Sequence, residues 1–339
     1  MLLRAKIADI ARIAGLSSAS VSRILNGHGR YSEETAKRVK KIADEIGYYK
    51  NRSAADLASP TNNTIGVINY PAETGANDQV IRGIMEEANH NGLDVIIMMS
   101  ERDDQESIGR TVQNMIERRV FGVLFLSVRP DQEIIDKLKQ ANIYPQEVAS
   151  ASDHQISYVS SNDFQIGYQA TKFLINQGYH EIGFVGADIS KDFIGVNRYQ
   201  GYQKALAESR IKPDDRWIFE GDGKYSYESG IQAVQYFEQE SIPVSAVLAT
   251  SDDAALGLIN GMADVGKHIP EDLAVIGIDG TQVCVRNRPQ ITSVTQNFRL
   301  MGQMAVDELI RPNRKITDVR QIEIPFSIEQ RETTKQGLR

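Results

Sequence analysis

The sequence predicts an all-α head that contains a helix-turn-helix, followed by an α/β body with parallel sheets. Two observations support this prediction. Over residues 7–26 the apolar residues recur at the spacing of short amphipathic helices, and from residue 65 onward short apolar runs alternate with amphipathic stretches. The chain has 339 residues, which is long enough for two or three domains that each bury a core.

The first two helices are predicted on either side of a tight turn at Gly15. The apolar residues between 7 and 14 share one helical face, and Gly15 accepts the backbone conformation that the turn needs. Ser17 can cap a second helix that begins at Ser18. The leading face of that helix offers side chains that suit a DNA major groove: Ser18, Ala19, Ser22 and Arg23. Double-stranded DNA is therefore the first partner that the sequence predicts.

A third helix is predicted after the loop at residues 27–31. Ser32 is a good N-cap, and Glu33 and Glu34 lie in the first turn, where the helix dipole favours acids. The apolar face consists of Ala36, Val39, Ile42, Ala43 and Ile46. Gly47 ends the helix. Three such short helices form a module of about 50 residues with a small core.

The charge of the chain is divided unevenly. The whole chain has a net charge of -7, but residues 1–59 contain 11 basic and 6 acidic side chains, a net charge of +5. The remaining 280 residues have a net charge of -12. A basic head can exchange condensed counterions for phosphate contacts, whereas an acidic body is repelled by DNA.

A joint is predicted between the head and the body, over residues 48–64. Residues 51–58 are compatible with a helix but too few to hold one in water, and residues 59–64 read as a flexible break. We therefore expect this hinge to become ordered only when something supports it.

The body is predicted to contain two parallel sheets covered by helices on both faces. The expected strands are the apolar runs at 65–68, 95–98, 122–126, 182–186, 246–249 and 273–277. Amphipathic stretches at 79–91, 104–118 and 131–141 are the expected helices of the first half. In open sheets of this kind ligands bind beyond the carboxyl ends of the strands.

Several classes of protein are disfavoured by the composition. Cys284 is the single cysteine, so no intrachain disulfide can form, and no apolar run approaches the length of a membrane span or of a signal-peptide core. The five histidines have no partner at zinc-ligand spacing. Glycine-rich nucleotide turns and a nucleophile elbow are missing, which argues against an enzyme. We expect a cytoplasmic protein with no metal, no cofactor and no membrane contact.

The chain resembles the lactose-repressor/galactose-repressor (LacI/GalR) family of bacterial transcription regulators over essentially its whole length. The matching motifs are Asp9-Ile10-Ala11, Ala14-Gly15-Leu16-Ser17, Val21-Ser22-Arg23-Ile24-Leu25-Asn26, Asn51-Arg52, Leu57-Ala58, Arg198-Tyr199-Gln200-Gly201-Tyr202, Ser251-Asp252, Ala255-Leu256-Gly257, Val275-Ile276-Gly277-Ile278-Asp279, Gln296-Asn297-Phe298 and Met301-Gly302. The resemblance implies a regulator, most simply a repressor of carbohydrate-utilisation genes, whose affinity for its operator depends on a small sugar-like effector.

The resemblance also implies a periplasmic-binding-protein-like body of two subdomains joined by three crossovers, with the effector in the cleft. The expected domains are a head at 1–48, a hinge helix and linker at 49–63, and an effector-binding and dimerisation domain at 64–339. The first subdomain comprises about 64–161 and 295–323, and the second about 162–294 and 324–339.

The resemblance assigns roles at the DNA interface. Ser18, Ala19 and Arg23 match base-reading positions, where Arg23 can contact guanine through two bonds and Ala19 can pack on a thymine methyl group; a phosphate contact is the alternative for Arg23. The remaining expected DNA-binding residues, most of them phosphate contacts, are Ser22, Asn26, Tyr48, Asn51 and Arg52. Leu57 matches a leucine that enters the minor groove and bends the duplex, although packing on the body is an alternative for it.

The expected effector site combines carboxylates, an arginine and aromatic rings, the groups that recognise a sugar's hydroxyls and its apolar face. Its residues are Asn69, Ser127, Arg198, Tyr225, Asp252, Asp279 and Phe298. Arg198 and Asp279 match residues that hold the effector in the family, with an ion pair between subdomains as the alternative. Asp252 could instead cap the helix that begins near Asp253.

A homodimer and a pseudo-palindromic operator are expected, because the chain ends soon after residue 334 and lacks the C-terminal leucine-rich helix of tetrameric relatives. Three alternatives stay open at this point. The regulator could answer to a purine or nucleoside, or to a phosphocarrier protein, and a sugar-processing enzyme is the alternative of a different class.

Overall fold

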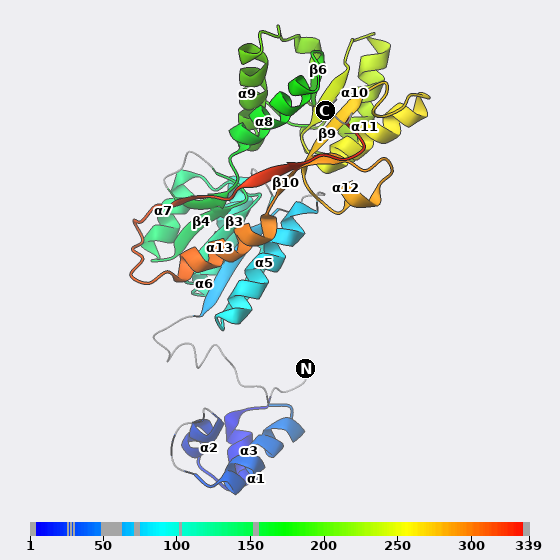
Figure 1. Ribbon diagram of the computed structural model, residues 1–339. Helices are drawn as coiled ribbons and strands as arrows, with labels where there is room; N and C mark the ends of the chain where they lie inside the picture. Colours follow the sequence, from blue (N-terminus) through cyan, green and yellow to red (C-terminus); the bar gives the residue numbers. More distant parts are fainter. Residues whose placement is uncertain are drawn as a thin grey trace. The chain divides into compact units, whose positions relative to one another are not determined.

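The computed structural model divides the chain into two compact units, residues 1–62 and residues 63–339 (Figure 1). It describes residues 5–48 except 26, 28 and 30, and residues 63–334 except 71–74, 102–103 and 152–155.

The first unit contains the three predicted helices, α1 (Ile7–Ala14), α2 (Ser18–Leu25) and α3 (Glu33–Glu45). Gly15 ends α1 in the left-handed conformation, with φ 66°. The hydroxyl of Ser17 accepts a hydrogen bond from the Ser20 N–H at 3.1 Å, and the hydroxyl of Ser32 accepts one from the Thr35 N–H at 3.2 Å. Both predicted caps are therefore present, and the helix-turn-helix is confirmed.

One small core holds these helices together. Its buried members come from all three helices: Ile10, Ala11, Ala14, Val21, Ile24, Val39, Ile42 and Ala43. The Arg38 guanidinium also donates to the Ala14 carbonyl at 3.1 Å, which ties α3 to the end of α1. The core fixes α2 against its neighbours and leaves its opposite face to solvent.

The second unit is built on two six-stranded sheets. The first sheet is entirely parallel, with the strand order β11-β5-β4-β3-β1-β2. Its strands are β1 (Thr64–Asn69), β2 (Asp94–Met99), β3 (Gly122–Leu126), β4 (Tyr144–Val148), β5 (Ser157–Ser160) and β11 (Gln321–Glu323). Helices α5 (Ala76–His90), α6 (Gln105–Glu117), α7 (Gln132–Gln140) and α13 (Phe298–Ile310) belong to this first lobe.

The second sheet has the order β12-β10-β9-β8-β6-β7 and is parallel except for the antiparallel pair β10 and β12. Its strands are β6 (Ile182–Val185), β7 (Ile218–Phe219), β8 (Ala246–Ala249), β9 (Ala274–Asp279), β10 (Thr292–Gln296) and β12 (Phe326–Glu329). The helices of this second lobe are α8 (Asp163–Asn176), α9 (Phe193–Glu208), α10 (Tyr227–Gln239), α11 (Asp252–Asp264) and α12 (Val283–Arg286), with a 3-10 turn at Asp215–Trp217.

The chain crosses between the lobes three times. It leaves the first sheet after β5, returns between β10 and α13, and leaves again between β11 and β12 (Figure 1). Separate apolar cores lie on both faces of each sheet. This arrangement confirms the predicted two-lobed α/β body with parallel sheets.

Close helix packing in the second lobe depends on a glycine. A Cβ atom at Gly167 of α8 would lie 2.0 Å from the carbonyl oxygen of Arg198 on α9, so only glycine permits this approach. The contact fixes the backbone from which Arg198 extends. Within the described residues, none of the helices is both long and apolar enough to cross a membrane.

Candidate functional site

The predicted recognition helix presents its polar side chains together. Ser18, Ala19 and Arg23 are exposed and Ser22 is half-buried, while Val21 and Ile24 are buried on the other face of α2. Ala19, Ser22 and Arg23 follow Ser18 by one, four and five positions, so the four residues share one side of the helix. The Arg23 Nε atom lies 3.4 Å from the carbonyl oxygen of Ala19, along its own helix.

Of the other predicted DNA-binding residues, Tyr48 lies within the described part of the chain. Tyr48 is half-buried against the core of the head, so part of its ring serves packing. Asn26, Asn51, Arg52 and Leu57 lie outside the described residues.

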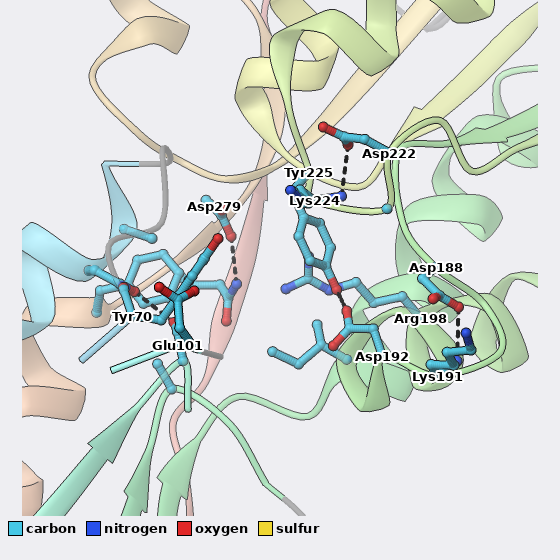
Figure 2. Close-up of a pocket in the computed structure, with 18 of the residues that line it drawn as sticks. Tyr70, Glu101, Asp188, Lys191, Asp192, Arg198, Asp222, Lys224, Tyr225 and Asp279 are labelled. Carbon is cyan, nitrogen blue, oxygen red and sulfur yellow. Dashed lines mark hydrogen bonds between the residues drawn. The ribbon is translucent and has the colours of Figure 1, made fainter. Parts of the chain in front are cut away.

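A cavity of about 1070 Å³ lies between the two lobes of the body (Figure 2). Its lining residues follow the carboxyl ends of strands from both sheets, as open α/β sheets predict. Tyr70, Glu101 and Ser127 come after β1, β2 and β3 of the first lobe; in the second lobe Asp188 comes after β6 and Asp279 ends β9. The site is thus assembled from both lobes.

Five predicted effector residues line this cavity: Ser127, Arg198, Tyr225, Asp279 and Phe298. They come from elements as far apart in the sequence as β3 and α13, so the fold brings them together as the resemblance implied. The two other predicted residues, Asn69 and Asp252, do not line it.

Arg198 is the central cation of the cavity. Its side chain is buried, its Nε donates to Asp163 Oδ1 at 2.8 Å, and its Nη1 donates to the Thr250 carbonyl at 2.7 Å. The guanidinium also lies over the Tyr225 ring, 5.7 Å from its centroid. Burial raises the pKa of Asp163, and the Arg198 charge opposes that rise. The pair fixes the guanidinium plane at the cavity wall.

Asp279 ends strand β9 with a strained backbone. Its φ is 116°, a conformation that side chains rarely adopt, and Gln296 donates to its Oδ1 at 3.0 Å. Burial raises the pKa of Asp279 to about 8; the charge of Arg198 lowers it, and that of Asp252 raises it further. Near neutral pH the carboxyl is therefore largely protonated, so it can donate one hydrogen bond as well as accept others.

Aromatic side chains line both walls of the cavity. Tyr225, in the left-handed region with φ 63°, donates its hydroxyl proton to Asp192. Tyr70 and Phe298 come from the first lobe, on the opposite wall. Aromatic faces on both sides of a polar cavity suit a flat, partly apolar ligand with hydroxyl groups at its edge.

The prediction that Asn69 lines the site is wrong. Asn69 is buried behind Asn77, whose Nδ2 donates to Asn69 Oδ1 at 3.0 Å and to the Tyr70 carbonyl at 3.0 Å. Asn77 is the residue that reaches the cavity, and its Oδ1 accepts a hydrogen bond from the Ser127 hydroxyl at 3.0 Å. Asn69 therefore positions a lining residue.

Both predictions for Asp252 are wrong as well. Its side chain is 1% exposed, with Oδ2 accepting from the Thr281 N–H at 2.6 Å and Oδ1 from the Ser293 hydroxyl at 2.6 Å. The cap of α11 is Ser251, which accepts from the Ala254 N–H at 2.9 Å. Asp252 thus ties together the segments that follow β8, β9 and the start of β10.

Sequence reasoning missed most of the charged lining residues. These are Glu101, Asp104, Asp188, Lys191, Asp192, Asp222, Lys224 and Glu228 (Figure 2). Glu101, Asp188 and Asp222 lie two or three residues after a strand, so their position near the carboxyl edge of a sheet was the signal that could have found them. Among the described residues there is no group of three or more metal-ligating side chains close enough to hold an ion.

A helix-turn-helix unit followed by a two-lobed body with a polar interlobe cavity defines a ligand-responsive DNA-binding regulator. Comparisons with known proteins agree. Residues 6–51 match the family of bacterial regulatory proteins named after LacI, and residues 171–334 match the periplasmic binding protein-like domain.

Full-length relatives share this architecture. The chain is 33% identical to catabolite control protein A of Priestia megaterium, covering 97% of this chain and 99% of the relative. Among solved structures, the lac repressor dimer bound to operator and an anti-inducer superposes with a TM-score of 0.84 at 26% identity, covering 98% and 99%. The catabolite control protein A of Weissella paramesenteroides with bound sucrose gives 0.73 at 29% identity, covering 80% and 98%.

The chain therefore belongs to the LacI family of bacterial transcription regulators. The family assignment confirms the resemblance predicted from the sequence, and it makes the protein a DNA-binding regulator controlled by a small molecule. The relatives are regulators of transcription and not enzymes.

Proposed function

We propose that the protein is a homodimeric repressor of carbohydrate-utilisation genes that acts in the bacterial cytoplasm. Its heads bind a pseudo-palindromic operator, and a carbohydrate in the interlobe cavity changes operator affinity. The observation that supports the ligand class is the cavity itself, where Arg198 and Asp279 offer hydrogen-bonding groups between the aromatic faces of Tyr70, Phe298 and Tyr225. The sucrose-bound relative supports the same class.

In this proposal Ser18, Ala19 and Arg23 read bases, because they share the exposed face of α2. Ser22, Asn26, Tyr48, Asn51 and Arg52 contact phosphates, and Leu57 enters the minor groove. The domain limits at 48 and 63 then separate the DNA-binding head, the hinge and the effector-binding body.

The dimer is supported by apolar side chains on the first lobe. β2 is an edge strand, yet Ile97 is 38% and Met99 59% exposed, and Met85 on the neighbouring helix α5 is 46% exposed. An apolar edge strand open to water is avoided in monomers and favours contact with a second copy. The lac repressor structure that resembles this chain is a dimer.

The coupling needs only a difference in ligand affinity between two arrangements of the lobes. The ligand-contacting residues lie on both sides of the cleft, so a bound sugar favours one separation of the lobes over another. A difference of a few kcal/mol changes operator affinity by one or two orders of magnitude.

A thermal-shift screen of the full chain tests the ligand class. The panel contains sugars, sugar phosphates, purines and nucleosides. A ligand present at 100 times its Kd stabilises the fold by about 2.7 kcal/mol, which raises Tm by roughly 5–10 °C. Stabilisation by purines or nucleosides alone would replace the carbohydrate proposal with a nucleobase effector, and no shift with any small molecule would point to a phosphocarrier protein.

A further inference from the structure

We propose that the interlobe cavity selects an uncharged saccharide of two or more linked rings and rejects phosphorylated sugars. This inference rests on the proposed carbohydrate function and narrows it to one class of sugar. Charge, helix capping and cavity size each support it.

The described lining of the cavity is rich in carboxylates. Besides Asp279 it contains six acids and three cations. The acids are Glu101, Asp104, Asp188, Asp192, Asp222 and Glu228. A phosphate group brought into this lining meets like charges, which weakens its binding unless cations compensate.

The three cations of this lining already face carboxylates. Arg198 forms a buried ion pair with Asp163 at 2.8 Å. Hydrogen bonds from Ser190 and the Lys191 N–H lower the pKa of Asp188, and the charge of Lys191 adds to this effect. Burial tends to raise the pKa of Asp222. Hydrogen bonds from the Lys224 N–H and from Ser229, together with the charge of Lys224, outweigh burial and lower this pKa. The Arg198 charge is therefore paired before a ligand arrives, and Lys191 and Lys224 each lie close enough to a carboxylate to lower its pKa.

Two helix N-termini at this cavity, of the kind that bind phosphates in many α/β proteins, are closed by acids, whereas α5, whose first residues Ala76 and Asn77 also line the cavity, has Gly75 as its N-cap and no side-chain cap. The N-terminus of α6 is capped by Asp104, which accepts from the Glu106 and Ser107 N–H groups at 2.9 and 3.1 Å. The N-terminus of α9 is capped by Asp192, which accepts from the Gly195 N–H at 3.2 Å. Both capping acids line the cavity, so a phosphate would have to displace a carboxylate at either helix.

Two features indicate more than one sugar ring. The volume of about 1070 Å³ lies just above the ~300–1,000 Å³ range of small-molecule sites. A small second cavity shares Ser127, Lys191, Asp192 and Ile194 with the first and extends it to Arg129 and Phe193. There the Arg129 guanidinium lies over the Phe193 ring, 5.2 Å from the centroid.

The second cavity is close to neutral and contains an aromatic ring. Arg129 and Lys191 are balanced by Glu147 and Asp192. Phe193 provides a second apolar face, separate from the Tyr70, Phe298 and Tyr225 faces of the main cavity. The second cavity has a volume of about 50 Å³, too small for a sugar ring, so both rings would lie in the main cavity, with the edge of one of them toward Phe193.

Isothermal titration of the full chain with matched sugars tests the charge and the size separately. The probes are glucose, glucose 6-phosphate, sucrose, sucrose 6-phosphate, trehalose, trehalose 6-phosphate, maltose, cellobiose and lactose. We expect at least one disaccharide to bind about tenfold more tightly than glucose, and each phosphate to bind at least about tenfold more weakly than its parent, a difference of about 1.4 kcal/mol. A phosphate or glucose as the tightest ligand overturns this inference and leaves the carbohydrate proposal intact, whereas no binding by any sugar overturns the carbohydrate proposal.

A charge variant tests the electrostatic argument. Glu101→Lys replaces an exposed acid of the lining with a cation, so the ratio of phosphate Kd to parent Kd should fall by about fivefold or more, and 0.5 M salt should weaken the effect. Glu271→Lys makes the same charge change at the amino end of β9 and outside the cavity lining, and it serves as the matched control. Equal ratios for the two variants would contradict the role of the lining charges.

An aromatic variant tests the second subsite. Phe193→Ala should weaken disaccharide binding by roughly 2- to 12-fold, more than it weakens glucose binding, because a stacked ring contributes about 0.5–1.5 kcal/mol. Phe193→Tyr keeps the ring and should restore affinity. Circular dichroism and the ligand-free Tm report on folding, and equal losses for mono- and disaccharide in a folded Phe193→Ala variant refute the subsite.

Discussion

The raised pKa of Asp279 makes a prediction about stability that can be isolated with one isosteric variant. Asp279→Asn keeps the oxygen that accepts the hydrogen bond from Gln296 and removes the titrating group. Because the buried carboxyl is protonated near neutral pH, the amide should resemble the native side chain at acidic pH and differ from it as the pH rises.

The direction in which stability changes with pH follows from proton binding. The pKa of Asp279 is 3.8 in an ordinary setting and about 8 in the folded chain, so between these values the folded state holds a proton that the unfolded chain has released. Stability contributed by the protonated group is complete below pH 4 and is lost as the pH rises to 8. The slope is about 1.4 kcal/mol per pH unit, so from pH 5 to pH 7 the native protein loses ~2.7 kcal/mol, or roughly 5–10 °C in Tm, relative to the variant.

Calorimetric Tm values from pH 5 to pH 9 measure this difference. Subtracting the curve of the variant from that of the native chain cancels the titrating groups that do not interact with Asp279, so the difference reports Asp279 together with the neighbouring Asp163 and Asp252. Asp264→Asn, the same substitution at an exposed acid on α11, is the matched control. Parallel curves for the native chain and Asp279→Asn would refute the assignment of a protonated carboxyl.

Three further variants test other parts of the molecule. Asp163→Ala leaves the Arg198 guanidinium buried without its carboxylate and should destabilise the fold by about 3–5 kcal/mol in urea unfolding, whereas a loss below 1 kcal/mol would contradict the buried pair. Leu57→Ala should weaken operator binding by roughly tenfold or more with effector affinity intact, and an unchanged operator titration rules out the minor-groove role. Arg23→Lys should lose about 1–3 kcal/mol of sequence discrimination because an ammonium lacks the guanidinium fork, while the salt dependence stays constant; a loss that is equal on specific and random DNA would show a phosphate contact instead.

The helices of the head were predictable because local rules agree there. Apolar spacing, the capping hydroxyls of Ser17 and Ser32 and the glycine turn at Gly15 all specify the same three helices. In the body, amphipathic spacing predicted the bounds of α5, α6 and α7 to within a few residues. Each of these helices buries one face, and α6 and α7 are also capped by the acids that precede them, so the sequence describes them without knowledge of their neighbours.

Several strands could not be predicted because their buried side chains are polar. β4 has the sequence Tyr-Pro-Gln-Glu-Val, in which Gln146 and Glu147 are almost completely buried. Gln146 donates to the Ala305 carbonyl of α13 at 3.2 Å. A buried polar residue is tolerated where a distant segment supplies its hydrogen bonds, and that segment is invisible in the local pattern.

The effector residues show the same limit. Asn69 and Asp252 lie near the ends of buried strands, as the sequence predicts. The Asn69 side chain is hydrogen-bonded to Asn77, however, and the Asp252 side chain to Thr281 and Ser293. Position along a strand predicts the edge of the sheet that a residue occupies. It does not predict whether the side chain enters the cavity or holds the next loop in place.

The placement of Gln296 and Phe298 suggests how a ligand in this cavity can act at a distance. Both line the cavity and flank Asn297, at the crossover between β10 and α13. Asn297 caps α13, and α13 packs along α5, where a Cβ atom at Gly302 would lie 2.2 Å from the Val80 carbonyl. Such close packing leaves little room for α13 to move alone, so a ligand that changes the crossover must move α5 with it. Since α5 also bears the exposed Met85 of the proposed dimer surface, a sugar that favours one arrangement of the lobes should alter the spacing between two protomers, and with it the spacing of their heads.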